Sequence, residues 1–247
     1  MKTTNGQTVN SKWASLYLIG GAAALFAGIV FRRNIGAELV LFAGQTLPNT
    51  VLEWFTLLQN NSLLGVSLLN IFDVVDYALV GIMFLALYAA LRRVNESYMT
   101  IAAAFGFAGI SVYFTSNTAL SMLFLSNQYA AATTETQKTL LIAAGQTMLA
   151  QGQSTGAYTS LLLVAVTGLI ISIVMLQSKV FGKATAYVGI FAGALDLAYC
   201  VTTFALVPEL DAFLLSSAGL SLMIWHILAG RKLYQLGQIN QKRRCNS

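Results

Sequence analysis

The sequence predicts an all-α integral membrane protein, a six-helix bundle with short interfacial helices in two long outer loops. Of its 247 residues, 57% are hydrophobic and only 9% are charged. A soluble domain carries roughly 25% charged residues, so this composition does not suit a surface that faces water. Six apolar runs are long enough to cross the hydrocarbon core of a bilayer, which takes roughly 20 residues per helix. The basic residues, moreover, gather on one side of these runs.

The six predicted spans form a single domain over residues 1–247. The first follows a short basic segment, so we weighed a signal peptide. Its apolar run, Ala14 to Phe31, is longer than the roughly 7–15 residues of a signal core, and no polar cleavage region follows. We therefore interpret it as a spanning helix. The spans are residues 13–31, 63–91, 99–125, 158–176, 185–207 and 210–228.

The net charge of +5 is best explained by topology. With six spans and both termini in the cytoplasm, eleven of the 14 Lys and Arg residues lie inside and three outside, the bias that cytoplasmic loops show. No nucleic-acid partner is therefore expected. The inner residues are Lys2, Lys12, Arg92, Arg93, Lys179, Lys183, Arg231, Lys232, Lys242, Arg243 and Arg244, and the outer ones are Arg32, Arg33 and Lys138.

The first long outer loop, residues 32–62, carries two apolar runs on either side of Pro48. These runs, residues 35–42 and 51–58, are interrupted by single polar side chains. That pattern suits short helices lying at the membrane interface.

The second long outer loop, residues 126–157, contains a helix start signal. Thr134 with Gln137 three residues later resembles a capping box ahead of residues 140–149. We expect both loops to cap the bundle from outside, either only covering helix ends or also closing over a ligand.

Three acidic residues fall inside the spans, Asp73, Asp76 and Asp196. A charge at the bilayer centre costs about 2.5–3.5 kcal/mol on insertion scales. By helix rise, Asp76 lies roughly 22 Å and Asp196 about 16 Å above the inner end of its span, and Asp73 lies at the outer margin. Because no Lys or Arg falls within the spans, we expect the acids to be protonated or hydrogen-bonded.

These acids lead to a candidate intramembrane polar site of four residues. Asn117 lies at a similar depth on the third span, and Tyr199 lies one turn beyond the acid of the fifth. Such groups either fix helix register or form a protonatable or substrate-binding site in a transporter-like cavity. A third alternative is that Asp73 and Asp76 lie outside the membrane core. The candidate site is Asp76, Asn117, Asp196 and Tyr199.

Small residues recur every three or four positions on the first and fifth spans, which lets helix backbones approach closely. We expect the small and polar face of the fifth span to point into the bundle. The packing partners, within one chain or between chains, stay open. The small residues are Gly20, Ala24 and Gly28 on the first span, and the face of the fifth is Gly189, Gly193, Asp196, Cys200 and Thr203.

No catalytic residue, metal or cofactor is expected. His226 is the only histidine, and at the end of the sixth span it is better placed for interfacial anchoring than for catalysis. A catalytic zinc usually needs three protein ligands, which this chain does not offer. Ser221 lacks the second glycine of a nucleophile elbow, since residue 223 is Met. We do not expect an enzyme.

Three segments resemble a known family. They are "LYAALRR" at Leu87–Arg93, "LFLSNQYAAA" at Leu123–Ala132 and "IWHILAGRKL" at Ile224–Leu233. Through these the chain resembles, over most of its length, a bacterial family defined by a domain of unknown function, the one numbered four-three-eight-six. The resemblance implies a six-pass protein of the bacterial inner membrane and brings no activity or site residues.

Two function hypotheses follow. In the first, the chain binds or transports a small or lipid-like molecule through the polar intramembrane site. In the alternative, it is a structural or regulatory membrane subunit whose basic tail, Lys242 to Arg244, contacts anionic lipid or a partner. The lipid bilayer is the expected partner in both, and the oligomeric state stays open.

Overall fold

The computed structural model describes residues 13–42, 48–152, 154–204 and 208–245, and every regular element of two or more residues in these ranges is an α-helix. The predicted all-α fold is confirmed. The helices are α1 (Ala14–Phe42), α2 (Val51–Asn60), α3 (Ser62–Leu68), α4 (Ile71–Leu91), α5 (Glu96–Ser116), α6 (Ala119–Ala131), α7 (Glu135–Gly152), α8 (Thr155–Gln177), α9 (Lys183–Phe204) and α10 (Pro208–Cys245).

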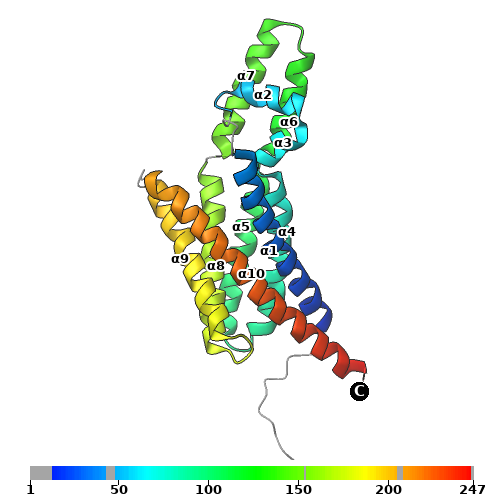
Figure 1. The fold of residues 1–247 in the computed structure, drawn as a ribbon, viewed down its shortest axis with the longest axis vertical. Coiled ribbons are helices and arrows are strands. Elements are labelled where there is room, and N and C mark those ends of the chain that lie inside the picture. Colours follow the sequence, from blue (N-terminus) through cyan, green and yellow to red (C-terminus); the bar gives the residue numbers. More distant parts are fainter. Residues whose placement is uncertain (1–12, 43–47, 153, 205–207, 246–247) are drawn as a thin grey trace, which may run out of the picture.

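Six long helices form a ring in chain order. Each of α1, α4, α5, α8 and α9 packs against the next, and α10 returns to pack against α1. Successive helices run in opposite directions, so the α4–α5 and α8–α9 turns lie at one end of the ring (Figure 1). The six helices enclose an interior space, and only some of them line it.

The long apolar helices are compatible with a membrane bundle. Within the described residues, five are long and apolar enough to cross a bilayer, and Ala14–Ile29 is a shorter apolar helix. The five are Ile71–Leu91, Glu96–Ala131, which comprises α5 and α6, Glu135–Gln177, which comprises α7 and α8, Lys183–Thr203 and Phe213–Lys242.

Glycines let α1 and α10 approach closely and close the ring. A Cβ added at Gly21 would lie 2.6 Å from the backbone N of Tyr234 and 2.9 Å from the backbone O of Gly230. One at Gly28 would lie 3.1 Å from Ile227 Cγ1. The prediction of close helix packing is confirmed, and the packing is within one chain.

The four remaining helices, α2, α3, α6 and α7, form a cap beyond the ring, at the end opposite the C-terminus (Figure 1). The cap has an apolar core of its own, separate from that of the ring. Both long outer loops therefore contribute to one helical layer. The buried residues of the cap core are Val51, Trp54, Phe55, Leu58, Val66, Ala119 and Met122.

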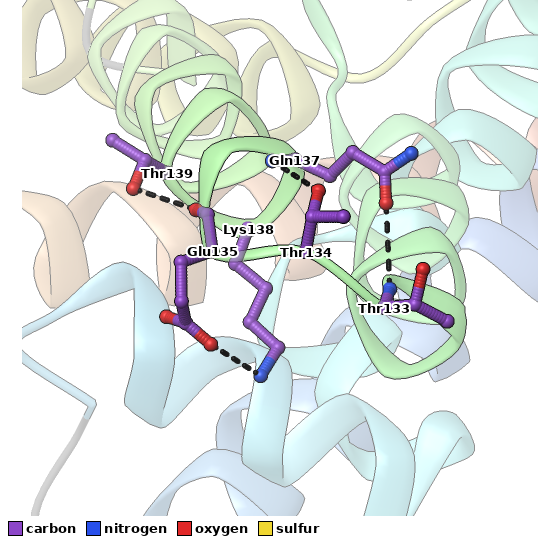
Figure 2. A network of polar contacts seen from close by, with 6 residues as sticks. All are labelled: Thr133, Thr134, Glu135, Gln137, Lys138 and Thr139. Atoms are coloured by element: carbon purple, nitrogen blue, oxygen red, sulfur yellow. Dashed lines mark hydrogen bonds and ion pairs between the residues drawn. The ribbon is translucent and has the colours of Figure 1, made fainter.

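Side-chain caps start three of the cap helices, α2, α3 and α7. At α2, Thr50 Oγ1 accepts a hydrogen bond from the backbone N–H of Glu53, and the Glu53 carboxylate accepts one from the backbone N–H of Thr50. At α7, the backbone N–H of Gln137 donates to Thr134 Oγ1 at 3.3 Å, as the sequence predicts. Figure 2 shows this start, where Gln137 Oε1 accepts from the backbone N–H of Thr133.

The helix boundaries differ from the predictions in four places. The first span continues as α1 to Phe42, so the loop run 35–42 is the end of that helix and not a separate interfacial helix. Predicted span 63–91 is divided between α3 and α4, because Asn70 adopts a left-handed conformation with φ 60°. Predicted span 99–125 is divided at Asn117, where α5 ends. Predicted span 210–228 lies within α10, which continues to Cys245, and residues 205–207 of the fifth span lie outside the described residues.

Because the cap has its own apolar core, we expect it to unfold locally while the ring stays folded. Phe55→Ala removes a fully buried ring that packs on Tyr129 at 5.4 Å between centroids, and such a loss costs about 3–5 kcal/mol. We expect faster amide hydrogen exchange in α2 and α6 and unchanged exchange in α4. Leu52→Ala on the same helix, where the side chain is 47% exposed, should change little. Equal loosening of α4 would show that cap and ring unfold as one unit.

Candidate functional site

A cavity of about 200 Å³ lies inside the ring, between α4, α8, α9 and α10. Its walls are mostly apolar side chains, with a few polar groups among them. Gly168 lies on the wall, and a Cβ added there would meet no other atom within 4 Å. The polar lining groups are Asp73, Asp76, Tyr77, Asp196, Trp225 and His226.

All three predicted acids line this cavity, and two of them are buried there. Asp76 on α4 is 2% exposed and Asp196 on α9 is 5% exposed, and both line the wall. Asp76 Oδ1 has no hydrogen-bond partner in the part of the chain that the structure describes. No Lys or Arg lines the cavity. Residues 120 positions apart thus place two carboxyl groups in one apolar space.

Further polar groups are buried on α8 and α10, at positions farther from the cap. The Trp225 indole N–H and the Ser172 hydroxyl are buried and make no hydrogen bond to the described residues. Both lie against the α-carbon of Gly189, where any larger residue would collide with them. Gly189 therefore lets α9 approach α8 and α10 at this level.

His226 is not the interfacial anchor that the sequence suggests. It is 3% exposed, lines the cavity and places its Nδ1 atom 2.7 Å from the backbone O of Leu222. Its ring meets that of Trp225 edge to face, at 5.4 Å and 78°. The prediction was wrong because α10 does not end near Leu228, so residue 226 lies well inside a longer helix.

A second, larger cavity of about 620 Å³ lies between the cap and the ring. Trp54 of the cap lines it together with Asn70, Tyr113 and Asn117 at the outer end of the ring. Asp73 lines both cavities. The side chains around Asp73 therefore form the partition between the outer and the central cavity.

Hydrogen bonds and ring stacking hold this partition. The Tyr113 hydroxyl lies 3.3 Å from Asp73 Oδ2 and 3.3 Å from the backbone O of Asn70. The Tyr113 ring stacks on that of Tyr77, with centroids 4.0 Å apart. Asn117 Nδ2 donates to the backbone O of Asn70 at 3.0 Å. The break between α3 and α4 is thus fixed by side chains of the third predicted span.

The four predicted site residues are not all brought together. Asp76 and Asp196 line the central cavity, and Asn117 lines the outer one. Tyr199 is half-buried on α9 and lines neither. Sequence reasoning missed Tyr77, Trp225 and the lining role of His226, for which periodicity gives no signal. Within the described residues, no group of three or more His, Cys, Asp or Glu side chains is placed to hold a metal ion.

The partition yields a prediction for Tyr113→Phe. The variant keeps the ring that stacks on Tyr77 and loses the hydroxyl, which is worth about 0.5–1.5 kcal/mol. The backbone N–H of Asp73, bonded to Asn70 O at 3.2 Å, should then exchange its hydrogen roughly twofold to tenfold faster. Tyr98→Phe, at an exposed tyrosine of the same helix, should leave that exchange unchanged. Equal rates in both variants would contradict the partition.

Comparison with known proteins identifies a family. A family model described as a domain of unknown function, DUF4386, matches residues 13–230. That range includes the cap and the ring as far as the middle of α10. No curated protein and no solved structure matches the chain. The match extends over most of the sequence, and the chain belongs to the DUF4386 family.

Proposed function

We propose that this protein binds and transports a small molecule through the central cavity of its membrane bundle. The observation that carries the proposal is the Asp76 carboxyl, buried on the cavity wall with an oxygen that has no partner among the described residues. Asp196 lies on the same wall. The other two predicted site residues, Asn117 and Tyr199, do not line this cavity.

Energetics favour a ligand over packing alone. Leaving a buried polar group unpaired costs about 1–3 kcal/mol, and more when it is charged. An acid that only fixes helix register would have its oxygens satisfied by neighbouring helices, as interhelical polar contacts usually are. Asp76 instead lines a cavity and has an oxygen without a hydrogen-bond partner among the described residues. A ligand that bonds to this oxygen would offset the cost.

The size of the cavity limits the ligand. An engineered protein cavity of about 150 Å³ binds benzene. The cavity here, about 200 Å³, suits a molecule of that size or slightly larger. A whole lipid is too large. The outer cavity, which shares Asp73 with the central one, supports access from the capped end.

The charge distribution supports a location in the cell membrane with both termini in the cytoplasm. Arg92 and Arg93 follow α4, while Lys179 and Lys183 flank the α8–α9 turn, at the end opposite the cap (Figure 1). Short cytoplasmic connections are enriched in Lys and Arg. A bacterial inner membrane and six passes agree with this arrangement.

The orientation is tested with reporter fusions. Green fluorescent protein, which does not fluoresce when exported unfolded through the general secretion route, should fluoresce when fused after Ser247. Alkaline phosphatase, which requires an oxidising compartment, should be active only when inserted in the cap after Ala132. The reverse pattern would invert the topology.

The proposed function is tested by native mass spectrometry of the protein released gently from its own membrane. We expect a defined bound mass in the wild type that is lost in Gly168→Leu, because the added side chain occupies cavity space. Gly182→Leu is the matched control. A Cβ at Gly182 also meets nothing within 4 Å, and this residue does not line the cavity.

The outcomes separate the two function hypotheses. A bound mass that persists in Gly168→Leu would place the ligand elsewhere and contradict the proposal. A wild-type protein without any bound mass, unchanged in both variants, would favour the structural or regulatory subunit.

A further inference from the structure

The geometry points to a small organic cation as the ligand of the central cavity, with its ammonium group at Asp76 and Asp196 and an apolar body below it. This inference rests on the proposed function and adds the chemical class of the ligand.

The charge of the lining favours a cation. Three carboxyl groups line the cavity, those of Asp73, Asp76 and Asp196, and no Lys or Arg does. The one basic side chain on the wall is His226. An anion would face three acids in a space of low dielectric, where like charges repel strongly. A cation would pair with the unpartnered oxygen of Asp76.

The walls favour an organic cation over a metal ion. Calcium takes six to eight oxygen ligands, and magnesium needs nearly ideal octahedral geometry. Inward from the acids, the cavity is lined by apolar side chains such as Val80, Val164 and Leu222. These cannot coordinate a metal ion, but they suit an alkyl or aryl body. Phe84 and Trp225 add ring faces that attract an ammonium or stack on an aryl group.

The two ends of the cavity are lined by different kinds of side chain. Asp73 and Asp76 lie in the first two turns of α4, whereas Phe84 lies roughly 12 Å farther along that helix than Asp76. On α9, Gly189, beside the Trp225 indole, lies about 10 Å from Asp196 along the axis. The acids therefore lie toward the outer end of the cavity, and Phe84 and Trp225 lie toward its inner end. An amphipathic cation matches this polarity.

The test is binding of three probes of nearly equal size to the full-length protein in nanodiscs, by isothermal titration at pH 7. Benzylammonium carries a positive charge, benzyl alcohol is neutral and benzoate is negative. We expect benzylammonium to bind at least about tenfold more tightly than benzyl alcohol, and benzoate not to bind. Asp76→Asn and Asp196→Asn keep the side-chain size and should each weaken benzylammonium binding about tenfold to hundredfold.

A control variant and a steric variant keep the result interpretable. Glu135→Gln removes an exposed acid of the cap and should leave binding unchanged. Gly168→Leu should abolish binding of benzylammonium if the probe enters the central cavity. Equal melting temperatures of Asp196→Asn and wild type would show that weaker binding does not come from misfolding.

The possible failures are distinguishable. Benzyl alcohol binding as tightly as benzylammonium, with no loss in Asp76→Asn, would overturn the cation and leave the cavity function standing. If native mass spectrometry detects a bound molecule and benzylammonium does not displace it, the cation is likewise overturned and the cavity function stands. If no probe binds and no bound mass is found, both the cation and the proposed function are overturned.

Discussion

Replacing Gly21 by leucine is expected to break the contact between α1 and α10 and to cost about 3 kcal/mol or more of folding free energy. An added Cβ would lie 2.6 Å from the backbone N and 2.9 Å from the Cα of Tyr234, and 2.9 Å from the backbone O of Gly230. These are backbone atoms, which cannot rotate away as a side chain does. The two helices would have to separate along their contact.

The measurement is thermal unfolding in mild detergent, followed by size-exclusion chromatography. For a protein of this size, 1 kcal/mol shifts the midpoint by roughly 2–4 °C, so we expect a fall of about 6–12 °C or no folded protein. Gly182→Leu, which adds the same side chain in open space, should shift the midpoint far less. Equal midpoints for the two variants would show that the close approach of α1 and α10 is not needed.

Replacing Asp76 by valine is expected to stabilise the protein while abolishing ligand binding. The substitution removes a buried oxygen that has no partner among the described residues, and such a group costs about 1–3 kcal/mol. The melting temperature of the ligand-free protein should therefore rise by roughly 2–12 °C. A residue that lowers stability and supports binding is typical of a functional site.

Asp73→Val is the matched control, because this acid lies three residues away on the same helix and is within hydrogen-bonding distance of Tyr113. Its loss should lower the melting temperature, since it leaves the Tyr113 hydroxyl with one partner fewer. The two substitutions thus have opposite expected signs. If Asp76→Val also lowers the melting temperature, Asp76 acts as a packing contact and the proposed function loses its main support.

Composition and hydropathy were enough to predict the helical membrane fold, but not the helix breaks. Residues 63–91 are mostly apolar despite Asn70, Asp73 and Asp76, so hydropathy indicates one span. The left-handed conformation of Asn70 divides it, and hydropathy carries no information about a single φ angle. The length of α10 was missed for another reason. Beyond residue 228, Leu233, Gly237 and Asn240 remain buried, because their spacing of three or four places them on one face of the helix.

The candidate site was predictable for the two acids and not for their neighbours. A buried acid in a membrane helix indicates a polar interior whatever its partner, so Asp76 and Asp196 could be found from sequence. Tyr199 was a wrong prediction because its side chain lies on a different face of α9 from the cavity. At 3.6 residues per turn, Gly193 and Tyr199 are each turned about 60° from Asp196, in opposite senses. Since Gly193 lines the cavity, Tyr199 points away from it.

The ring closes between the first helix and the last, and this has a consequence for synthesis. Helices enter the membrane in chain order, so the glycine face of α1 has no α10 to pack against until translation is nearly complete. A chain truncated before α10 lacks both the closing contact and the Trp225 side of the cavity. Completion of the polypeptide, integrity of the bundle and assembly of the site are therefore achieved in a single late step, and incomplete chains keep an exposed helix face that membrane quality-control proteases can recognise.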